Sequence, residues 1–276
     1  KKFMERTQSW LSDLKLRASW GINGNDQIDN NATYNLYYTN MSNGSYNFNG
    51  DGATVVPGVQ KDRSGNNDLK WEATKPLNFG IDAAFFDARL GVTLDYFQKK
   101  TTGMLIQKPY IGVIGEGGYK WYNAASMDNS GVEATFTWRD EIKDFKYDIS
   151  FNISYYKNEI TELYNGVQEY VMATTGMKLA VGHSYGEFYL NRYAGVNPAT
   201  GDPLWYDKNG EVTPVMNESD KVLVGHSYIA PWQGGFGTVV SWKGLSLGAQ
   251  FSWVADRWMI NNDRYFEENT TFDNYN

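Results

Sequence analysis

Hydrophobic and polar residues alternate with a period of two along several stretches of this chain. The clearest stretch runs from Phe145 to Tyr155, where every second residue is apolar or aromatic and the residues between are polar. Because successive side chains of a β-strand point to opposite faces, this stretch is predicted to be a strand with one apolar and one polar face. Its length matches the roughly 9–11 residues with which a tilted strand crosses a bilayer.

The same alternation recurs elsewhere and completes a set of about seven predicted strands. In residues 131–139, for example, Val132 and Phe136 fall on one face and Glu133 on the other. The remaining stretches are residues 14–20, 76–86, 89–106, 237–242 and 245–253. The polar face includes Lys146, Asp148, Ser150, Asn152, Glu133 and Arg139. An all-β fold is therefore predicted, with antiparallel hairpins at the short connections.

Long and short connections between these strands alternate strictly along the chain. The long ones run from Gly21 to Leu69, from Gln107 to Ser130 and from Lys157 to Gly234, and the short ones lie at Asp87, Asp140–Asp144 and Lys243–Gly244. This order places every tight turn at one end of the sheet and every long loop at the other. Such asymmetry is typical of an antiparallel transmembrane β-barrel with long extracellular loops, whereas sandwiches and propellers have no reason to keep it.

Composition agrees with a barrel wall. Aromatic residues make up 16% of the 276 residues, and many lie near the predicted strand ends, as expected for an interfacial girdle. No apolar run is long enough for a transmembrane helix, but alternating strands dilute hydrophobicity in a barrel. The chain has no cysteine, which excludes disulfides and thiol catalysis. A net charge of −7 argues against nucleic acid as a partner.

Six segments carry a recognisable family pattern: LSDLKLRASWGINGN at residues 11–25, NNDLKWEATKPLNFGID at 66–82, RLGVTLDYFQKKTTGML at 89–105, NSGVEATFTW at 129–138, GEFYLNRYAGVNPATGDPLWYDKNGEVT at 186–213 and APWQGGFGTVVSWKGLSLGAQFSW at 230–253. In this order they resemble the SusC/RagA family of TonB-linked outer-membrane transporters. The resemblance implies that residues 1–276 are part of a single barrel of about 22 strands. The plug, the TonB box and the closing strands of that family are absent from the chain.

The resemblance also implies a function and partners. A nutrient, an oligosaccharide or a peptide, would be captured together with a SusD-like surface lipoprotein and drawn through the lumen by the TonB complex. The protein would lie in the outer membrane, in contact with its lipid. Substrate contacts are expected from loop aromatics, since exposed rings stack on sugars or peptide side chains. The candidates are Trp121, Tyr122, Tyr189, Trp205 and Tyr206. Packing of the loops on one another is the alternative role for these rings.

The sequence offers little for catalysis, and no enzyme, catalytic residue or cofactor is predicted. His183 and His226 each lie in a Gly-His-Ser sequence, but neither has the frame of a serine hydrolase, so chance loop composition is the preferred interpretation. Nothing in their spacing marks the glutamates Glu116, Glu133 and Glu187 as an acid–base pair.

Metal binding is not predicted either. Residues 197–211 contain oxygen donors at Asp202, Asp207, Asn209 and Glu211, yet they fail the spacing of a calcium loop, and their Gly, Pro and Asn residues predict turns.

A soluble or surface-attached carbohydrate-binding β-sandwich is the competing hypothesis, and a secreted glycosidase is a third. The sandwich would bury the apolar face of residues 145–155 against a second sheet, whereas a barrel exposes that face to lipid. A glycosidase would need two carboxylates facing each other across a cleft.

Overall fold

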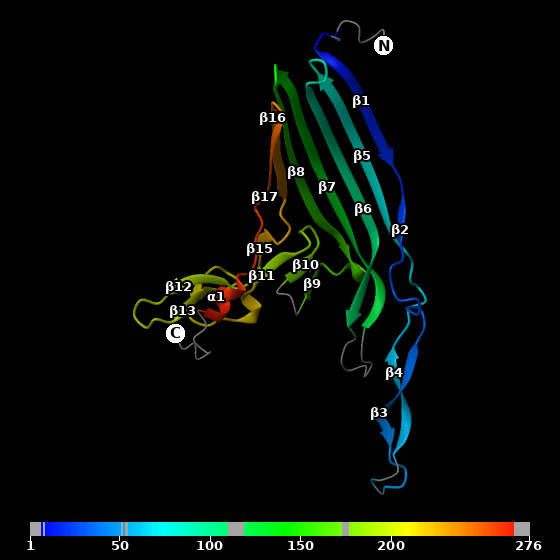
Figure 1. The fold of residues 1–276 in the computed structure, drawn as a ribbon. Helices are drawn as coiled ribbons and strands as arrows, with labels where there is room; N and C mark the ends of the chain where they lie inside the picture. Colours follow the sequence, from blue (N-terminus) through cyan, green and yellow to red (C-terminus); the bar gives the residue numbers. More distant parts are fainter. Residues whose placement is uncertain are drawn as a thin grey trace.

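The protein is built around one large antiparallel sheet, here called the wall (Figure 1). The structure is a computed structural model that describes residues 7, 9–50, 52, 55–109, 119–172 and 177–267. The strand order is β1-β5-β6-β7-β8-β16-β17, and the short β2 pairs with β5 beyond the end of β1. Their bounds are β1 (Leu11–Trp20), β2 (Asn23–Asn25), β5 (Glu72–Phe85), β6 (Leu90–Pro109), β7 (Tyr119–Ile142), β8 (Phe145–Leu163), β16 (Trp232–Trp242) and β17 (Leu245–Ala255). The predicted all-β antiparallel fold is confirmed.

Tight turns join neighbouring strands at one end of the wall. They are formed by residues 86–89, 143–144 and 243–244. Lys243 and Gly244 both have positive φ angles, 47° and 87°, as a two-residue hairpin turn matched to the strand twist requires. The turns gather at the top of Figure 1, and the long connections leave from the opposite end. The predicted segregation of short and long connections is therefore confirmed.

The strand register aligns the alternating patterns into one apolar and one polar face. Phe136 lies opposite Phe151, which lies opposite Phe236, and Phe236 lies opposite Phe251. These rings remain 37% to 61% exposed, and within the described residues no second sheet covers them. The sandwich hypothesis is therefore wrong, because its apolar face would have to be buried in a core.

Three strands extend further than the sequence pattern predicts. β6 reaches Pro109 and β7 begins at Tyr119, so most of the predicted loop from Gln107 to Ser130 is strand. β8 likewise continues to Leu163 instead of ending near Lys157. The alternation of apolar residues fades beyond the membrane-crossing length, but the backbone ladder does not depend on an apolar face and continues. For the same reason the predicted turn at Asp140–Asp144 shortens to two residues.

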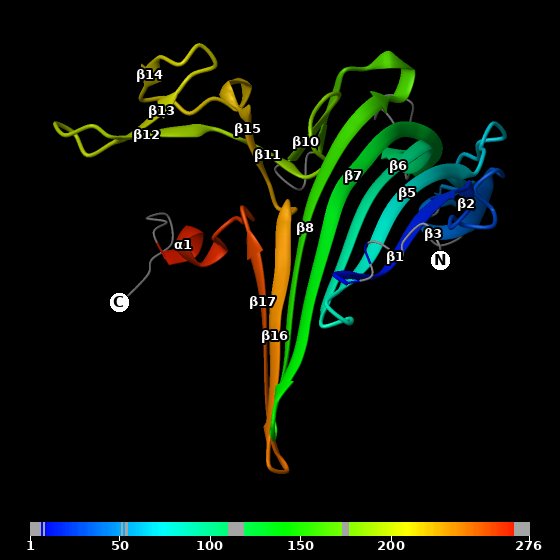
Figure 2. The same cartoon turned by 90° about the horizontal axis from the view of Figure 1, so that it is seen from above.

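The connection between β8 and β16, residues 164–231, forms a small folded unit of its own, here called the insertion. It contains a four-stranded sheet of order β15-β11-β10-β9 and a three-stranded sheet of order β12-β13-β14 (Figures 1 and 2). Leu179 of the insertion packs on Ile160 and Leu163 at the end of β8. The elements are η3 (Tyr164–Gly166), β9 (Glu169–Met172), β10 (Met177–Ala180), β11 (Glu187–Leu190), β12 (Arg192–Val196), β13 (Pro203–Tyr206), β14 (Val212–Thr213), η4 (Glu218–Asp220) and β15 (Val222–Ser227).

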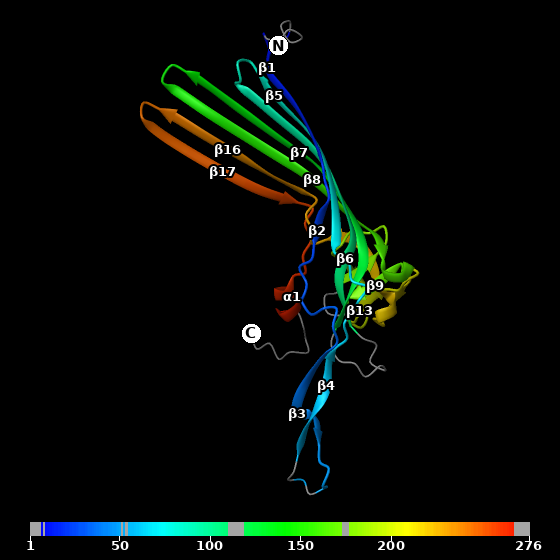
Figure 3. The same cartoon turned by 90° about the vertical axis from the view of Figure 1, so that its right-hand side faces the viewer.

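A second projection is the hairpin of β3 (Leu36–Tyr46) and β4 (Val56–Arg63), which extends away from the wall (Figure 3). Arg63 at its base forms an ion pair with Asp29. The short helix α1 (Asn262–Glu267) follows β17. None of the helices in the described part of the chain has the length and apolar character needed to cross a membrane.

Candidate functional site

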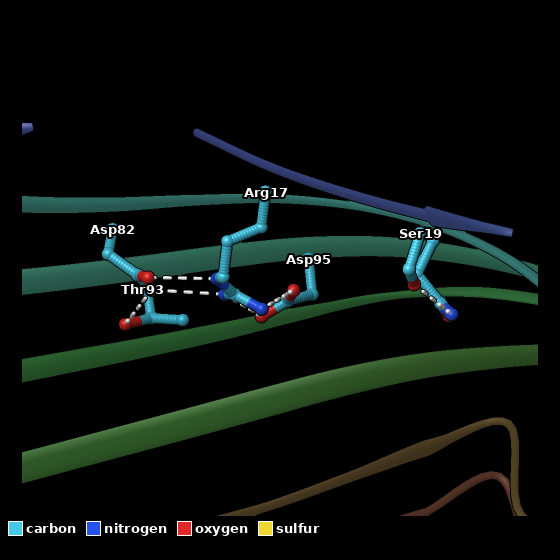
Figure 4. A network of polar contacts seen from close by, with 6 residues as sticks. Arg17, Ser19, Asp82, Thr93 and Asp95 are labelled. Carbon is cyan, nitrogen blue, oxygen red and sulfur yellow. Dashed lines mark hydrogen bonds and ion pairs between the residues drawn. The ribbon is translucent and has the colours of Figure 1, made fainter. Parts of the chain in front are cut away.

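The polar face of the wall carries an ion-pair network that spans three strands and centres on Arg17 (Figure 4). Arg17 Nε donates to Asp82 Oδ2 at 2.8 Å, and Arg17 Nη2 donates to Asp95 Oδ2 at 3.0 Å. Thr93 Oγ1 donates to Asp82 Oδ1 at 3.2 Å. The planar guanidinium thus binds carboxylates of both β5 and β6 from its place on β1. The network ties together the three strands at one edge of the wall.

Gly80 on β5 allows the Arg17 side chain to extend across β5 to Asp95 on β6. It lies opposite Arg17 on β1 and opposite Asp95 on β6. A Cβ atom at Gly80 would come within 2.6 Å of Arg17 Cζ and 2.4 Å of Asp95 Oδ1. The absence of a side chain at this position on β5 therefore leaves the path along which the guanidinium reaches β6.

Other charges on the polar face are also paired within the wall. The register places all the residues predicted for this face on it: Glu133, Arg139, Lys146, Asp148, Ser150 and Asn152. Arg139 forms an ion pair with Asp148, and Lys146 Nζ lies 3.2 Å from Glu141 Oε2. A solute passing this face would meet a polar surface whose charges are largely compensated.

Two of the predicted substrate-binding aromatics lie where β7 extends past the main wall. The carbonyl of Trp121 accepts a hydrogen bond from Asn66 Nδ2 at 2.8 Å, which holds the segment between β4 and β5 against β7. The ring of Tyr122 lies 5.0 Å from that of Tyr164, and Lys120 Nζ lies 5.6 Å from its centroid. Both side chains are half-buried.

The other three predicted aromatics belong to the insertion. Lys178 Nζ lies 4.7 Å from the ring centroid of Tyr189 in β11. In β13, the ring of Trp205 meets Tyr193 edge-on at 5.6 Å, and Arg192 lies 5.3 Å over the ring of Tyr206.

The structure does not bring the five rings into one site. They occupy the end of β7, the four-stranded sheet and the three-stranded sheet, and β13 lies apart from the end of β7 in both views (Figures 1 and 2). All five are half-buried, and the rings of Tyr122, Tyr189, Trp205 and Tyr206 each contact a neighbouring ring or cation. These contacts favour loop packing as part of their role and leave partial faces open for a ligand.

The two Gly-His-Ser segments lie close together in space. The sequence analysis attributed the repeated motif to chance loop composition and did not predict this proximity. Both contribute to one cavity of about 400 Å³ at the long-loop end of the wall. His183 Nδ1 lies 3.0 Å from the buried Glu187 Oε2, and His226 stacks on Trp258. The repetition of the motif was the available signal, but only the fold shows that the two copies meet.

The glutamates considered for a glycosidase do not form a facing pair. Glu133 is exposed on the polar face of β7, whereas Glu187 is 5% exposed in β11, where its carboxylate is engaged by His183 and by the backbone N–H of Gly225. Glu116 lies outside the described residues.

The oxygen-rich segment of the insertion folds as a turn around Asp207. Asp207 Oδ1 accepts hydrogen bonds from the backbone N–H groups of Glu211 and Asn209, both at 2.8 Å. The bond from Glu211 is the largest of the effects that hold the pKa of this carboxyl below its ordinary value. Within the described ranges, no group of three or more His, Asp or Glu side chains is placed to hold a metal ion.

Comparison with known sequences places the chain among outer-membrane receptors. Residues 6–276 match the family described as TonB dependent receptor-like, β-barrel. The chain is 30% identical to the TonB-dependent receptor SusC of Bacteroides thetaiotaomicron over 77% of this chain and 22% of that protein. It is 31% identical to the TonB-dependent receptor P39 of Formosa agariphila over 76% of this chain and 18% of that protein. The chain therefore spans about a fifth of the length of these relatives.

Solved structures of related transporters have the same fold as this chain. The RagAB peptide transporter superposes with a TM-score of 0.84 at 35% identity, over 95% of this chain and 28% of that one. RagAB in its open-open state gives the same TM-score at 34% identity. The two-faced wall, its tight turns at one end and this similarity have one explanation: the chain belongs to the TonB-dependent receptor β-barrel family and is part of an outer-membrane protein related to SusC and RagA.

Proposed function

We propose that the parent protein of this chain imports a nutrient across the outer membrane in a TonB-dependent way. The observation that carries the proposal is the wall itself, with one apolar face that stays exposed and one polar face whose charges are compensated by neighbours. That arrangement suits lipid on one side and a hydrated passage on the other. The passage needs no covalent chemistry from these residues, and we propose that the protein is not an enzyme.

Within the parent, we propose that residues 1–276 form one part of a single barrel of about 22 strands. The plug, the TonB box and the closing strands would be supplied by other parts of the parent protein. The share of the relatives that the chain covers, 22% of SusC and 28% of the RagAB chain, supports this division.

The proposed substrate is an oligosaccharide or a peptide, captured together with a SusD-like surface lipoprotein. The name of RagAB describes a peptide transporter, which supports a substrate of this size. The insertion also exposes apolar side chains in a region expected to face water: Tyr193, Val212 and Val215 are each more than half exposed. Apolar surface of this kind is typical of a docking site for another protein. Substrate contacts are assigned to Trp121, Tyr122, Tyr189, Trp205 and Tyr206.

Two engineered protease sites in the full-length parent test the proposal. One recognition sequence is inserted at Asn209–Gly210 in the insertion, and its matched control at Lys243–Gly244, since both are exposed turns with a positive-φ glycine at opposite ends of the wall. The parent is expected in the outer-membrane fraction, with cleavage of intact cells at the first site alone and of lysed cells at both. Recovery as a soluble protein, or cleavage of intact cells at both sites, would overturn the proposal.

A further inference from the structure

The apolar face of the wall carries a groove of about 740 Å³, here called the outer groove, which crosses the strands from β1 to β16. Its lining comes from two neighbouring rows of the strand register, one through Leu94, Ala134 and Ile153 and the other through Tyr96 and Trp232. The small side chain of Ala134 lies between the larger Leu94 and Ile153, so the surface is hollowed there. A void against lipid would forfeit packing contacts, and the groove is therefore suited to hold a hydrocarbon chain.

The same face turns from apolar to charged just beyond this groove, toward the long-loop end. On β6 every second side chain from Leu90 to Tyr96 is apolar or aromatic, and the second residue of this face beyond Tyr96 is Lys100. On β5 the corresponding residue is Lys75. Trp20, in the row between them and the groove, is 70% exposed. Tryptophan and tyrosine gather at the level of the lipid head groups, so the two lysines lie where those head groups begin.

Lys75 and Lys100 are directly opposite each other on neighbouring antiparallel strands. Like charges in such a position destabilise the pair unless an anion lies between them. Lys100 Nζ lies 3.5 Å from Asp128 Oδ2 on β7. Lys75 is exposed, and among the residues that the structure describes it has no ion-pair or hydrogen-bond partner. An ammonium group carries three donors, so both lysines keep donors for a ligand.

The remaining charges of this part of the face compensate one another. Lys157 Nζ lies 2.7 Å from Glu159 Oε2, and these two residues belong to the same two rows of the register as Lys75 and Lys100. With Lys100 paired to Asp128, the charge left over is positive and lies at Lys75 on β5. The lysine pair is therefore suited to an anion with several acceptor oxygens, such as a phosphate group.

A lipid with a phosphate in its head group satisfies both features at once. Lys100 is four residues beyond Tyr96, roughly 14 Å along the strand, and a lysine side chain can bend back over part of that interval. Acyl chains alone would give no selectivity, because all lipid tails are equally apolar. We infer that the wall binds a phosphorylated lipid of the leaflet on the long-loop side, with an acyl chain in the outer groove and its phosphate between Lys75 and Lys100. This inference goes beyond the proposed import function and requires only that the wall lie in the outer membrane.

The test uses the purified, delipidated full-length parent in detergent and native mass spectrometry with three probes: lipid A with one phosphate, the same lipid A without phosphate, and inorganic phosphate. Lys75→Gln combined with Lys100→Gln removes the cation pair, and the corresponding double arginine variant keeps both charges. Lys143→Gln combined with Lys243→Gln is the matched control, because these exposed lysines lie in the tight turns at the opposite end of the wall. Ala134→Phe fills the outer groove without changing charge.

Phosphorylated lipid A is expected to bind about ten- to thirtyfold more tightly than the form without phosphate. That ratio should fall to about twofold or less in the double glutamine variant and persist in the arginine variant and the matched control. Ala134→Phe should weaken binding of both lipid forms by roughly two- to threefold and leave their ratio unchanged. If the double glutamine variant fails to reach the membrane, Lys75→Gln alone, which leaves Lys100 paired with Asp128, should still lower the ratio.

Three results would contradict the inference: equal binding of the two lipid forms, an equal loss of the ratio in the matched control, or displacement of the lipid by inorganic phosphate at equal concentration. The last result would indicate a site for free phosphate. None of them bears on import, which is followed separately by comparing nutrient uptake in cells with and without TonB.

Discussion

The wall and the insertion differ in where their apolar side chains go. In the wall, Leu16, Leu247 and Phe251 are 61% to 73% exposed, and order comes from continuous backbone ladders. Where the insertion meets the end of β8, Leu179 packs with Ile160 and Leu163 into a cluster whose members are only 3% to 7% exposed. Within the described residues the wall has no core on its apolar face, whereas the insertion shares a small core with the end of β8.

This difference follows from the solvent that each region meets. Apolar side chains in water must be buried in the protein, but those in a bilayer are already in an apolar medium. Backbone polar groups have no partner in hydrocarbon, so the wall must satisfy them by unbroken strand pairing. The two regions should therefore respond to different substitutions. The wall should be disrupted by changes that break strand pairing, and the insertion by changes that remove buried apolar side chains.

The largest expected effect is on the ladder, from Gly131→Val in β7. A Cβ atom at Gly131 would lie 2.4 Å from the carbonyl oxygen of Tyr155 on β8 and 2.6 Å from Phe97 Cζ. Because the neighbouring backbone cannot move without breaking the pairing, the folded barrel should be lost from the outer membrane. The measurement is the amount of heat-modifiable, folded parent in that fraction.

Gly201→Ala in the insertion is the matched control for this substitution. Gly201 has a φ of 80°, but a Cβ atom added there would meet no other atom within 4 Å, so only backbone strain of roughly 1 kcal/mol is introduced. Equal losses for the two variants would contradict the distinction between ladder and loop.

The next effect is on the core that joins the insertion to β8, from Leu163→Ala at the end of β8. Removal of a side chain that is 5% exposed should destabilise the local packing by about 2–5 kcal/mol. The insertion should then be cleaved faster by protease on intact cells, while the membrane-embedded fragment persists. Leu247→Ala, at a lipid-facing position that is 70% exposed, should leave cleavage unchanged. Loss of the whole barrel in Leu163→Ala would show that the two regions are not independent.

A smaller effect is expected from Arg17→Met. The variant leaves Asp82 and Asp95 on adjacent strands without their shared cation, so the unfolding temperature of the purified parent should fall. Arg139→Met should lower it less, because the side chain of Arg139 is 73% exposed against 38% for Arg17. Asp82→Asn added to Arg17→Met should recover part of the loss. An equal fall for both single variants would contradict a special role for the Arg17 network in the stability of the wall.

The smallest effect concerns pH and the turn at Asp207. Its pKa is lowered, chiefly by the hydrogen bond from the backbone of Glu211, so the carboxylate stabilises this turn above the ordinary pKa of roughly 3.9. That contribution is lost as the pH falls from there through the lowered pKa. Hydrogen exchange in β13 and β14, corrected for its intrinsic pH dependence, should rise at pH 3 relative to pH 6. Asp207→Asn should abolish this difference, and exchange that is insensitive to the variant would contradict the role of the carboxylate.

Much of the wall was predictable because its signal is local. The alternation around Phe151 and Phe136 predicts which side chains share a face, and the Lys243–Gly244 turn predicts a hairpin. The ends of β6, β7 and β8 were not predictable, because the ladder continues where apolar alternation stops. The assignment of Trp121 and Trp205 to one binding function rested on residue type alone, which carries no information about distance between loops.

The sequence by itself determined the class of the protein: a period of two, strictly alternating connection lengths and the family segments all specify a two-faced membrane wall. These features depend on neighbours in the chain, and local geometry transmits them directly. Only the tertiary structure decided that Arg17 reaches over Gly80 to Asp95, and that His183 and His226 meet beside Trp258. Such contacts join residues far apart in the chain, and they exist only once strand register and loop folding have brought those residues together.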